Sequence, residues 1–228
     1  MWYNIHMERK NTLMTGEIYH VFTRSIADFK VFNVHQDYER MLKLFYFFQV
    51  EKSPIKFSNF INAKNVQQIG FRNSFDSLMQ DHDKIIQIIG YCLMPTHIHL
   101  ILRQLKNNGI SIFMGNILNS YSRYFNTLHK RKGPLWESKF QNILVKDDEQ
   151  LLHLTRYIHL NPVTVLLVRR PEDWKYSSYL EYLGLEANNL CSIENLINMY
   201  PDEYKKFVCD RIDYQRELAR IKKIILES

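Results

Sequence analysis

Two short segments, about sixty residues apart, hold the side chains of this chain that could act together on a phosphate. The first is PTHIH, residues 95–99, and the second is YIHLNPV, residues 157–163. Imidazoles and an amide oxygen can bind a divalent cation, and a cation with open coordination positions can hold phosphate oxygens. A phenol beside that phosphate can attack it as a nucleophile. We therefore predict a metal site formed by His97, His99 and Asn161, with Tyr157 as the nucleophile.

The spacing of the two histidines favours a strand. Side chains alternate along a strand, so residues 97 and 99 emerge on one face, whereas on a helix they would point to opposite sides. Ile98, Leu100 and Leu102 then form the apolar face of the same strand. Alone, the pair is weak evidence, because a solvated strand face with two ordinary histidines has the same pattern.

The second segment lies on a predicted helix that begins near Asp147 or Asp148. Pro162 is expected to end this helix, because the residue before a proline avoids helical geometry. At four-residue spacing His153, Tyr157 and Asn161 share one face. A free phenol is mostly protonated at neutral pH, so Tyr157 needs a proton acceptor, for which a water or His153 is our hypothesis. For His153, packing or a phosphate contact is the alternative.

The charge of the chain favours an anionic partner. Lys and Arg number 30 against 24 Asp and Glu, which gives a formal net charge of +6 and a pI near 9.1. Basic residues beside aromatic ones suit a nucleic-acid strand with exposed bases, although solvated turns beside core tryptophans give the same pattern. The candidate DNA-binding residues are Arg24, Arg123, Lys130, Arg131, Lys132, Trp136 and Lys139. For Arg24 and Arg123 the alternative is a surface or structural role, and for Trp136 a place in the core.

Composition predicts a globular protein of the reducing cytoplasm with no membrane partner. Apolar residues make up 46% and aromatic residues 14% of the chain, and no apolar run is long enough to cross a bilayer. Residues 1–10 lack the apolar core of a signal peptide. Cys92, Cys191 and Cys209 are scattered, which argues against a disulfide framework and against a zinc ribbon.

The predicted elements follow the order of a split βαβ fold. They are a strand from Glu17 to Arg24, a helix from Asp37 to Phe48, a strand from Ile85 to Leu93, the strand with His97, a helix with apolar positions from Met114 to Leu128, a strand from Lys139 to Lys146, and the helix with Tyr157. This order predicts an α+β, ferredoxin-like antiparallel sheet with an added catalytic helix. Its helices are expected mainly on one face, which leaves the other face open for a long ligand.

We expect residues 1–184 to form the catalytic domain and residues 185–228 a helical C-terminal extension. Residues 52–83, rich in Asn, Ser and Gln, are interpreted as a partly structured insertion. In the extension, Ser192 is expected to cap a short helix that ends at Met199, and Asp202 to Leu226 to form a long amphipathic helix.

Four motifs in this order resemble the single-tyrosine HUH transposases, most closely the REP-associated tyrosine transposases. Besides the two segments above, they are GPLWESKF, residues 133–140, and WKYSSY, residues 174–179, and the resemblance covers roughly residues 14–184. It implies that His97 and His99 bind Mg²⁺ or Mn²⁺, that Tyr157 is the nucleophile, and that Asn161 completes the metal site. The chain departs from the family pattern at Thr164 to Leu167, where a basic residue and a glycine often follow, and in the insertion.

The resemblance implies a metal-dependent enzyme that nicks and rejoins single-stranded or hairpin DNA through a covalent 5′-phosphotyrosine. The alternative is a nucleic-acid-binding protein of the same fold that does not cleave. A third hypothesis is a metal hydrolase that uses an activated water, with Tyr157 as a bystander. A monomer is favoured over a dimer.

Overall fold

A four-stranded antiparallel sheet forms the centre of the protein. The computed structural model describes residues 13–51, 53–186, 190–193 and 196–217. The strands β1 (Ile18–Arg24), β2 (Ile86–Met94), β3 (His97–Gln104) and β4 (Gln141–Val145) lie in the order β2-β3-β1-β4. Every neighbouring pair is antiparallel, and β2 and β3 form a hairpin closed by Pro95 and Thr96. The predicted alternation of strands and helices and the α+β class are confirmed.

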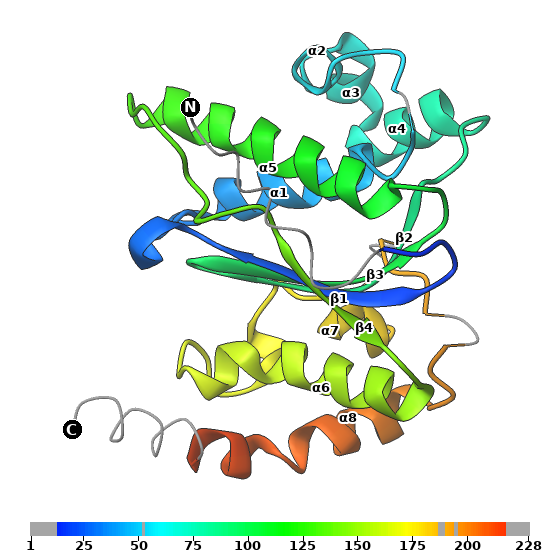
Figure 1. Cartoon of the computed structure of the whole chain (residues 1–228), viewed down its shortest axis with the longest axis vertical. Helices are drawn as coiled ribbons and strands as arrows, with labels where there is room; N and C mark the ends of the chain where they lie inside the picture. Colours follow the sequence, from blue (N-terminus) through cyan, green and yellow to red (C-terminus); the bar gives the residue numbers. More distant parts are fainter. Residues whose placement is uncertain (1–12, 52, 187–189, 194–195, 218–228) are drawn as a thin grey trace, which may run out of the picture.

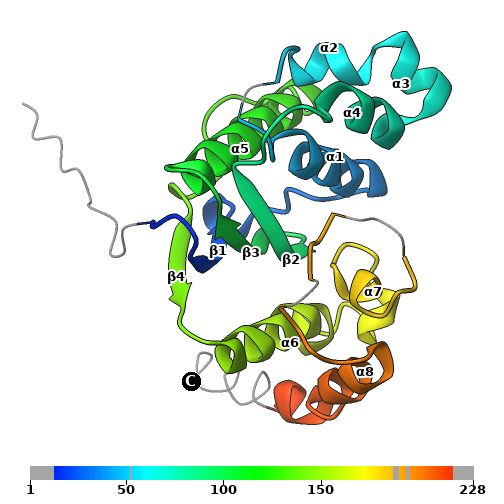
Figure 2. The same ribbon diagram turned by 90° about the vertical axis from the view of Figure 1, so that its right-hand side faces the viewer.

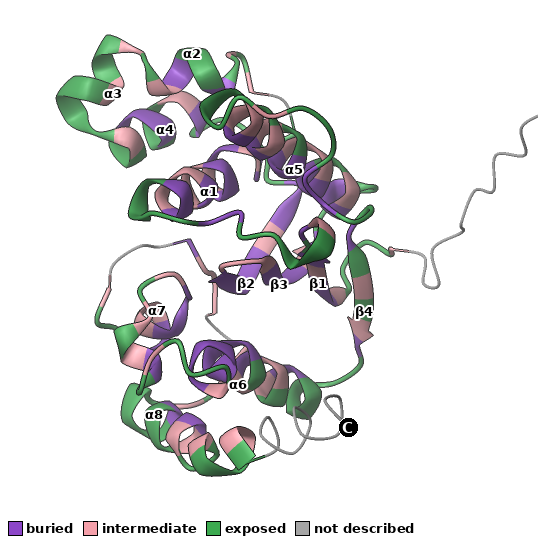
Figure 3. Cartoon of the chain, turned by 90° about the vertical axis from the view of Figure 1, so that its left-hand side faces the viewer, coloured by how far each residue is buried: buried purple, intermediate pink, exposed green. Residues whose placement is uncertain are grey.

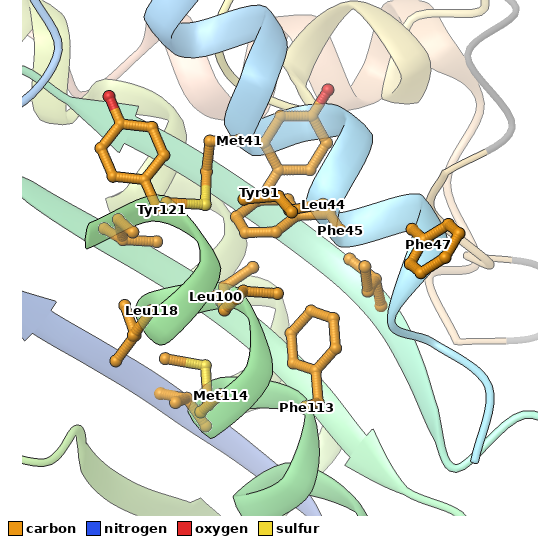
Figure 4. Packing of buried hydrophobic residues seen from close by; sticks show 14 of the residues in the cluster. Met41, Leu44, Phe45, Phe47, Tyr91, Leu100, Phe113, Met114, Leu118 and Tyr121 are labelled. Atoms are coloured by element: carbon orange, nitrogen blue, oxygen red, sulfur yellow. The ribbon is translucent and has the colours of Figure 1, made fainter. Parts of the chain in front are cut away.

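Two long helices cover one face of the sheet (Figure 1). They are α1 (His35–Phe47) and α5 (Gly109–Leu128), which follow β1 and β3. Side chains of both helices pack over the sheet beside Leu100 of β3 (Figure 4). They include Met41, Leu44, Phe45, Phe113, Met114 and Tyr121, all buried. Burial of each such side chain stabilises the folded state by about 1.5–3 kcal/mol, so this layer fixes the position of β3.

The other face of the sheet is not open, which corrects the prediction that the helices lie mainly on one side. Helices α6 (Asp148–Thr164), α7 (Tyr179–Tyr182) and α8 (Pro201–Cys209) lie there (Figures 1 and 2). The sheet presents apolar side chains such as Ile101 on this face, and Ile158 of α6 buries them. A second apolar cluster, which includes Leu160 and Tyr204, joins α6 to α8. The face that was expected to bind a long ligand is therefore partly covered by the helix that carries Tyr157.

Helix α6 begins where the sequence predicts and ends later. The Asp147 side chain accepts a hydrogen bond from the backbone N–H of Gln150 at 2.7 Å and caps the helix. Pro162 does not end α6, which continues to Thr164. A proline lacks its own N–H, so it removes one bond near the end of the helix, where few further bonds remain to be lost. Residues 158–163 are all buried (Figure 3).

The predicted insertion contains three short helices, α2 (Phe57–Ile61), α3 (Lys64–Ile69) and α4 (Phe71–Met79), at the outer side of α1 and α5 (Figure 2). Their aromatic side chains pack against the end of α1: the rings of Phe57 and Phe60 lie 5.1 and 5.4 Å from the ring of Phe47. The segment thus shares the hydrophobic core on the α1 and α5 side of the sheet.

The predicted helix from Ser192 to Met199 is wrong in the part that the structure describes, residues 192–193 and 196–199. At and just before its expected start the backbone is tied to other elements: the N–H of Ser192 donates to Ile88 O of β2 at 2.9 Å, and the N–H of Cys191 donates to the Glu181 carboxylate at 3.0 Å. The longer predicted helix appears as α8 and a second helical stretch at 212–217, and its end at Leu226 lies outside the described residues. Within the described residues, no helix is long and apolar enough to span a membrane.

Candidate functional site

Strand β3 presents His97 and His99 on the face that α6 partly covers. The two rings are 5.0 Å apart and nearly perpendicular. Burial lowers the pKa of His97 to about 4, and nearby Arg24 adds to the effect. Burial, with His20, His97 and Arg24 around it, holds the pKa of His99 well below its ordinary value. Both imidazoles are therefore neutral at pH 7, which is the form that binds metal ions.

Tyr157 reaches the same place from α6. Its side chain is 44% exposed, although its neighbours on the helix from Ile158 to Val163 are buried. The ring stands edge-on to the His99 ring, with centroids 5.8 Å apart and planes at 86°. The phenol is thus accessible to a ligand and lies beside the two imidazoles, as the sequence predicts.

A cavity of about 380 Å³ joins these groups. Its lining residues come from β1, β3, β4, the segment before β4, and α6; they are Phe22, Thr23, Arg24, His97, Ile98, His99, Glu137, Ser138, Lys139, Gln141 and Tyr157. Two of the predicted DNA-binding residues, Arg24 and Lys139, are among them. Arg24 makes an ion pair with Asp28 at 3.3 Å, and because both side chains are exposed this pair contributes little and can be exchanged for a phosphate.

The sequence interpretation missed His20, which lies on β1 and is buried. Its Nε2 is 3.0 Å from Nδ1 of His99, and the two rings are stacked with centroids 5.2 Å apart. Burial lowers the pKa of His20 to about 4. The predicted topology places the first strand beside the strand with His99, and counting back by two from Arg24 puts His20 on the same face. That alternation was the signal that could have found it.

Asn161 lies one turn after Tyr157 on α6 and is buried, with its Nδ2 lacking a hydrogen-bond partner. It is not one of the described residues that line the cavity. A buried amide without a partner costs free energy unless a ligand satisfies it, so the orphaned group suits a ligand-binding role. A half-turn of the amide about its last bond exchanges oxygen and nitrogen, so either atom can face a ligand.

The donor atoms fit a divalent cation. His97 Nδ1 contacts Thr96 Oγ1 at 2.9 Å, and His99 Nδ1 contacts His20, so each ring has its Nε2 left for a metal. Two neutral imidazoles and one amide would leave further coordination positions for substrate oxygens. Among the described residues, no group of three or more His, Cys, Asp and Glu side chains is placed to hold a metal. A complete set of metal ligands would therefore need the amide of Asn161 and oxygen atoms of the substrate.

The structure does not bring His153 to the cavity. Its ring packs against Phe207 of α8, and its Nδ1 accepts a hydrogen bond from the Arg156 guanidinium at 2.6 Å. Its Nε2 lies 3.8 Å from a carboxylate oxygen of Glu149. Because a guanidinium only donates, Nδ1 of His153 is already occupied and is a poor proton acceptor.

The remaining predicted DNA-binding residues are spread over the molecule. Arg123 of α5 lines a separate cavity of about 710 Å³ between α1, α5 and the insertion, together with Arg40 and Lys56. Lys130 and Lys132 are exposed in the turn after α5, where Arg131 bonds to the side chain of Asn126 at 3.0 Å. These residues do not line the cavity with Tyr157.

Trp136 is a correction, because the structure makes it a core residue rather than a base-stacking one. It is 8% exposed, its indole N–H donates to Leu118 O at 3.4 Å, and its ring packs beside Tyr121. An indole buried under α5 offers no free face on which a nucleobase could stack.

Comparisons with known proteins identify the family that this arrangement is similar to. Residues 59–161 match the model of the IS200-like transposases, a range that contains both histidines, Tyr157 and Asn161. Over 119 residues the chain is 25% identical to a putative REP-associated tyrosine transposase of Haemophilus influenzae. The matched residues are 48% of this chain and 66% of that protein, so the chain spans slightly less than two thirds of the relative's length. A solved REP-associated tyrosine transposase bound to a REP hairpin has the same fold, with a TM-score of 0.51 at 12% identity over 84% of this chain and 94% of that one.

Proposed function

Since the chain belongs to the IS200-like transposase family, we propose that it nicks and rejoins single-stranded or hairpin DNA, with Tyr157 as the nucleophile. The observation that carries the proposal is the place of Tyr157. Its ring is 44% exposed, stands 5.8 Å from the ring of His99, and lines one cavity with Arg24 and Lys139. Binding alone would not require an exposed phenol beside two neutral imidazoles.

The reaction is a transesterification. The Tyr157 oxygen attacks the phosphorus of a backbone phosphodiester, the bond from phosphorus to the 3′ oxygen breaks, and the products are a 5′-phosphotyrosine and a 3′-hydroxyl. The phenolic proton passes to water in the open cavity, and the departing 3′ oxygen takes up a proton. Because the phosphotyrosine keeps the energy of the ester, a second 3′-hydroxyl can reverse the step and rejoin the strand without nucleotide hydrolysis.

His97, His99 and Asn161 are the residues that would hold Mg²⁺ or Mn²⁺. Such a cation polarises the phosphate and stabilises the charge that develops on it. Imidazole ligands suit Mn²⁺ at least as well as the harder Mg²⁺, so both metals belong in the tests. Arg24 and Lys139 are suited to pair with neighbouring backbone phosphates, which would keep the scissile bond in front of the phenol.

The site draws β3 and α6 from one chain, which supports the proposal of a monomer. The REP hairpin bound to the solved relative supports hairpin DNA as the first substrate to try. The fold and the cationic side chains of Arg24 and Lys139 in the cavity also suit the alternative, a binding protein without cleavage, and the third hypothesis, a metal hydrolase. Only the tyrosine mechanism leaves DNA covalently attached to the protein.

The test uses hairpin DNA with single-stranded flanks taken from beside the protein's own gene, in Mn²⁺ or Mg²⁺. Substrate labelled at its 3′ end should become attached to the protein and survive denaturation, while 5′-labelled substrate should be released as a shorter strand. Mass spectrometry of the digested conjugate should locate the nucleotide on Tyr157. Binding with uncut DNA would favour the non-cleaving alternative, and cutting without a conjugate would favour the hydrolase.

A further inference from the structure

We propose that His20 positions His99 for metal binding by accepting a hydrogen bond from His99 Nδ1, which fixes the proton there and leaves His99 Nε2 free to bind the cation. The inference rests on the proposed function, because it concerns the metal that His97 and His99 would hold. His20 belongs to neither of the two segments on which the metal site was predicted.

The contact between the two rings is direct and protected from water. His20 Nε2 and His99 Nδ1 are 3.0 Å apart, and the side chains are only 9% and 7% exposed. The pairing of β1 with β3 sets this geometry: Phe22 is opposite His99, and His20 lies two residues further along the same face of β1. The main-chain pairing of β1 with β3 therefore places both imidazoles beside each other on one face of the sheet.

A neutral imidazole has one N–H, so the contact allows two proton arrangements. In the first, His99 Nδ1 donates to His20 Nε2, and His99 Nε2 keeps its lone pair. In the second, His20 donates to His99 Nδ1, and the proton of His99 is then on Nε2, where it blocks a metal. Only the first arrangement is compatible with a metal bound to His99, and a fixed partner on the second nitrogen is how proteins select it.

His20 is suited to be this partner rather than a third metal ligand. Its Nε2 is already occupied by Nδ1 of His99, at 3.0 Å. The ring of Tyr157 stands edge-on to both imidazoles, 6.3 Å from the ring of His20 and 5.8 Å from the ring of His99. The hydroxyl of Thr96 has the equivalent place beside His97 Nδ1, at 2.9 Å.

The test compares two substitutions of His20 in the full chain. His20→Phe keeps a ring of similar size but offers no acceptor, so His99 Nδ1–H would be buried without a partner. His20→Gln supplies a carbonyl oxygen that can accept the same hydrogen bond. We expect His20→Phe to weaken Mn²⁺ binding by about 10- to 100-fold, the usual loss when the partner of a metal-binding histidine is removed. Binding by His20→Gln should recover most of that loss.

Mn²⁺ binding is measured without DNA, by the loss of the free-ion electron paramagnetic resonance signal. His35→Phe is the matched control, because His35 is exposed and contacts Tyr176 away from the cavity. Two further measurements distinguish this role of His20 from a merely structural one. Nitrogen-15 spectra of the metal-free protein should show His99 protonated on Nδ1, and the bound Mn²⁺ should couple to the nitrogens of two imidazoles.

His20→Phe protein that is folded and binds Mn²⁺ as tightly as wild type would overturn the inference alone. So would a His99 proton on Nε2 in the metal-free protein, or coupling to three imidazoles, which would make His20 a ligand. If wild-type protein binds no Mn²⁺, or if His99→Ala binds it equally well, the proposed metal site fails and the role of His20 fails with it.

Discussion

Tyr157 and His159 are two residues apart on α6 and point to opposite sides of it. Tyr157 is 44% exposed in the cavity, whereas His159 is fully buried, with Nδ1 2.8 Å from Tyr204 Oη and Nε2 2.8 Å from Ser178 Oγ. Ser178 also bonds to the backbone N–H of Tyr91 on β2 at 2.9 Å. One helix thus offers the proposed nucleophile on one side and is tied to the sheet and to α8 on the other.

Replacing Tyr157 by Phe should abolish the covalent DNA conjugate and change the affinity for hairpin DNA by no more than about twofold. The substitution removes only the phenolic oxygen from an exposed ring, and the proposed binding rests on Arg24 and Lys139, which line the same cavity. Gel analysis under denaturing conditions measures the conjugate, and fluorescence anisotropy measures binding.

His153→Ala is the matched control for that experiment, because its side chain is on the same helix but packs on Phe207 outside the cavity. It should still form the conjugate. A Tyr157→Phe protein that becomes attached to DNA would assign the nucleophile to another residue, and loss of the conjugate in His153→Ala would restore His153 as a proton acceptor.

The stability of the protein should fall in mild acid partly through His159. Burial lowers the pKa of its imidazole from 6.5 to about 3, so the folded state keeps it neutral while the unfolded chain binds a proton. Its contribution is complete above pH 6.5 and is lost as the pH falls toward 3, by about 1.4 kcal/mol per pH unit.

Between pH 7 and pH 5, wild type should therefore lose about 2 kcal/mol more unfolding free energy than His159→Gln, because the glutamine does not titrate. Urea unfolding of both proteins at the two pH values measures this difference. The contributions of the other buried histidines are the same in both proteins and cancel. Equal losses would mean that His159 is not kept neutral in the folded state.

The sequence predicted what depends on local periodicity. Alternation along residues 97–103 placed His97 and His99 on one face, and four-residue spacing placed Tyr157 and Asn161 on one side of a helix. Long-range packing was not readable in this way. Trp136 and Trp174 look alike in sequence, and only the fold shows that α5 covers the first. The open sheet face was wrongly expected because nothing local says that Ile158 must bury Ile101.

The position of Pro162 shows a second kind of limit. Proline is a sound signal for the end of a helix, yet here tertiary packing keeps residues 158–163 buried and holds the backbone helical for two residues more. The segment before the predicted helix of residues 192–199 also makes contacts that no local pattern shows, because the N–H groups of Leu190 and Cys191 donate to Glu181 and that of Ser192 donates to Ile88 of β2. At Pro162, contacts between distant segments outweigh local preference.

A mixture of two inactive proteins should remain inactive. The cavity takes His97, His99 and Tyr157 from the same chain, so combining Tyr157→Phe with a His97→Ala, His99→Ala double variant should produce no conjugate. Conjugate in the mixture above the level of either variant alone would mean that α6 of one molecule serves the proposed metal site of another. Sedimentation of the wild-type protein with DNA is the accompanying measurement, and a monomer is expected.

Lys139→Ala should weaken hairpin binding by about tenfold and lower the salt dependence of log K by about one unit, because one phosphate contact is lost. Lys139 lines the cavity with Tyr157. Arg123→Ala is the control, since Arg123 lines the other large cavity, between α1, α5 and the insertion. Binding titrations at several salt concentrations separate the two. Equal effects of both substitutions would extend the DNA-binding surface to that second cavity.

Replacing Asn161 by Leu should remove activity without removing stability. The Asn161 amide is buried and its Nδ2 has no hydrogen-bond partner, a cost of about 1–3 kcal/mol that an apolar side chain of similar size avoids. The unfolding free energy in urea should therefore stay equal or rise. Conjugate formation in Mn²⁺ should nevertheless drop at least tenfold, because a proposed metal ligand is removed. A destabilised variant that still cleaves at the wild-type rate would make Asn161 a structural residue. A variant that is as stable as wild type but loses cleavage would show that Asn161 serves the ligand rather than the fold.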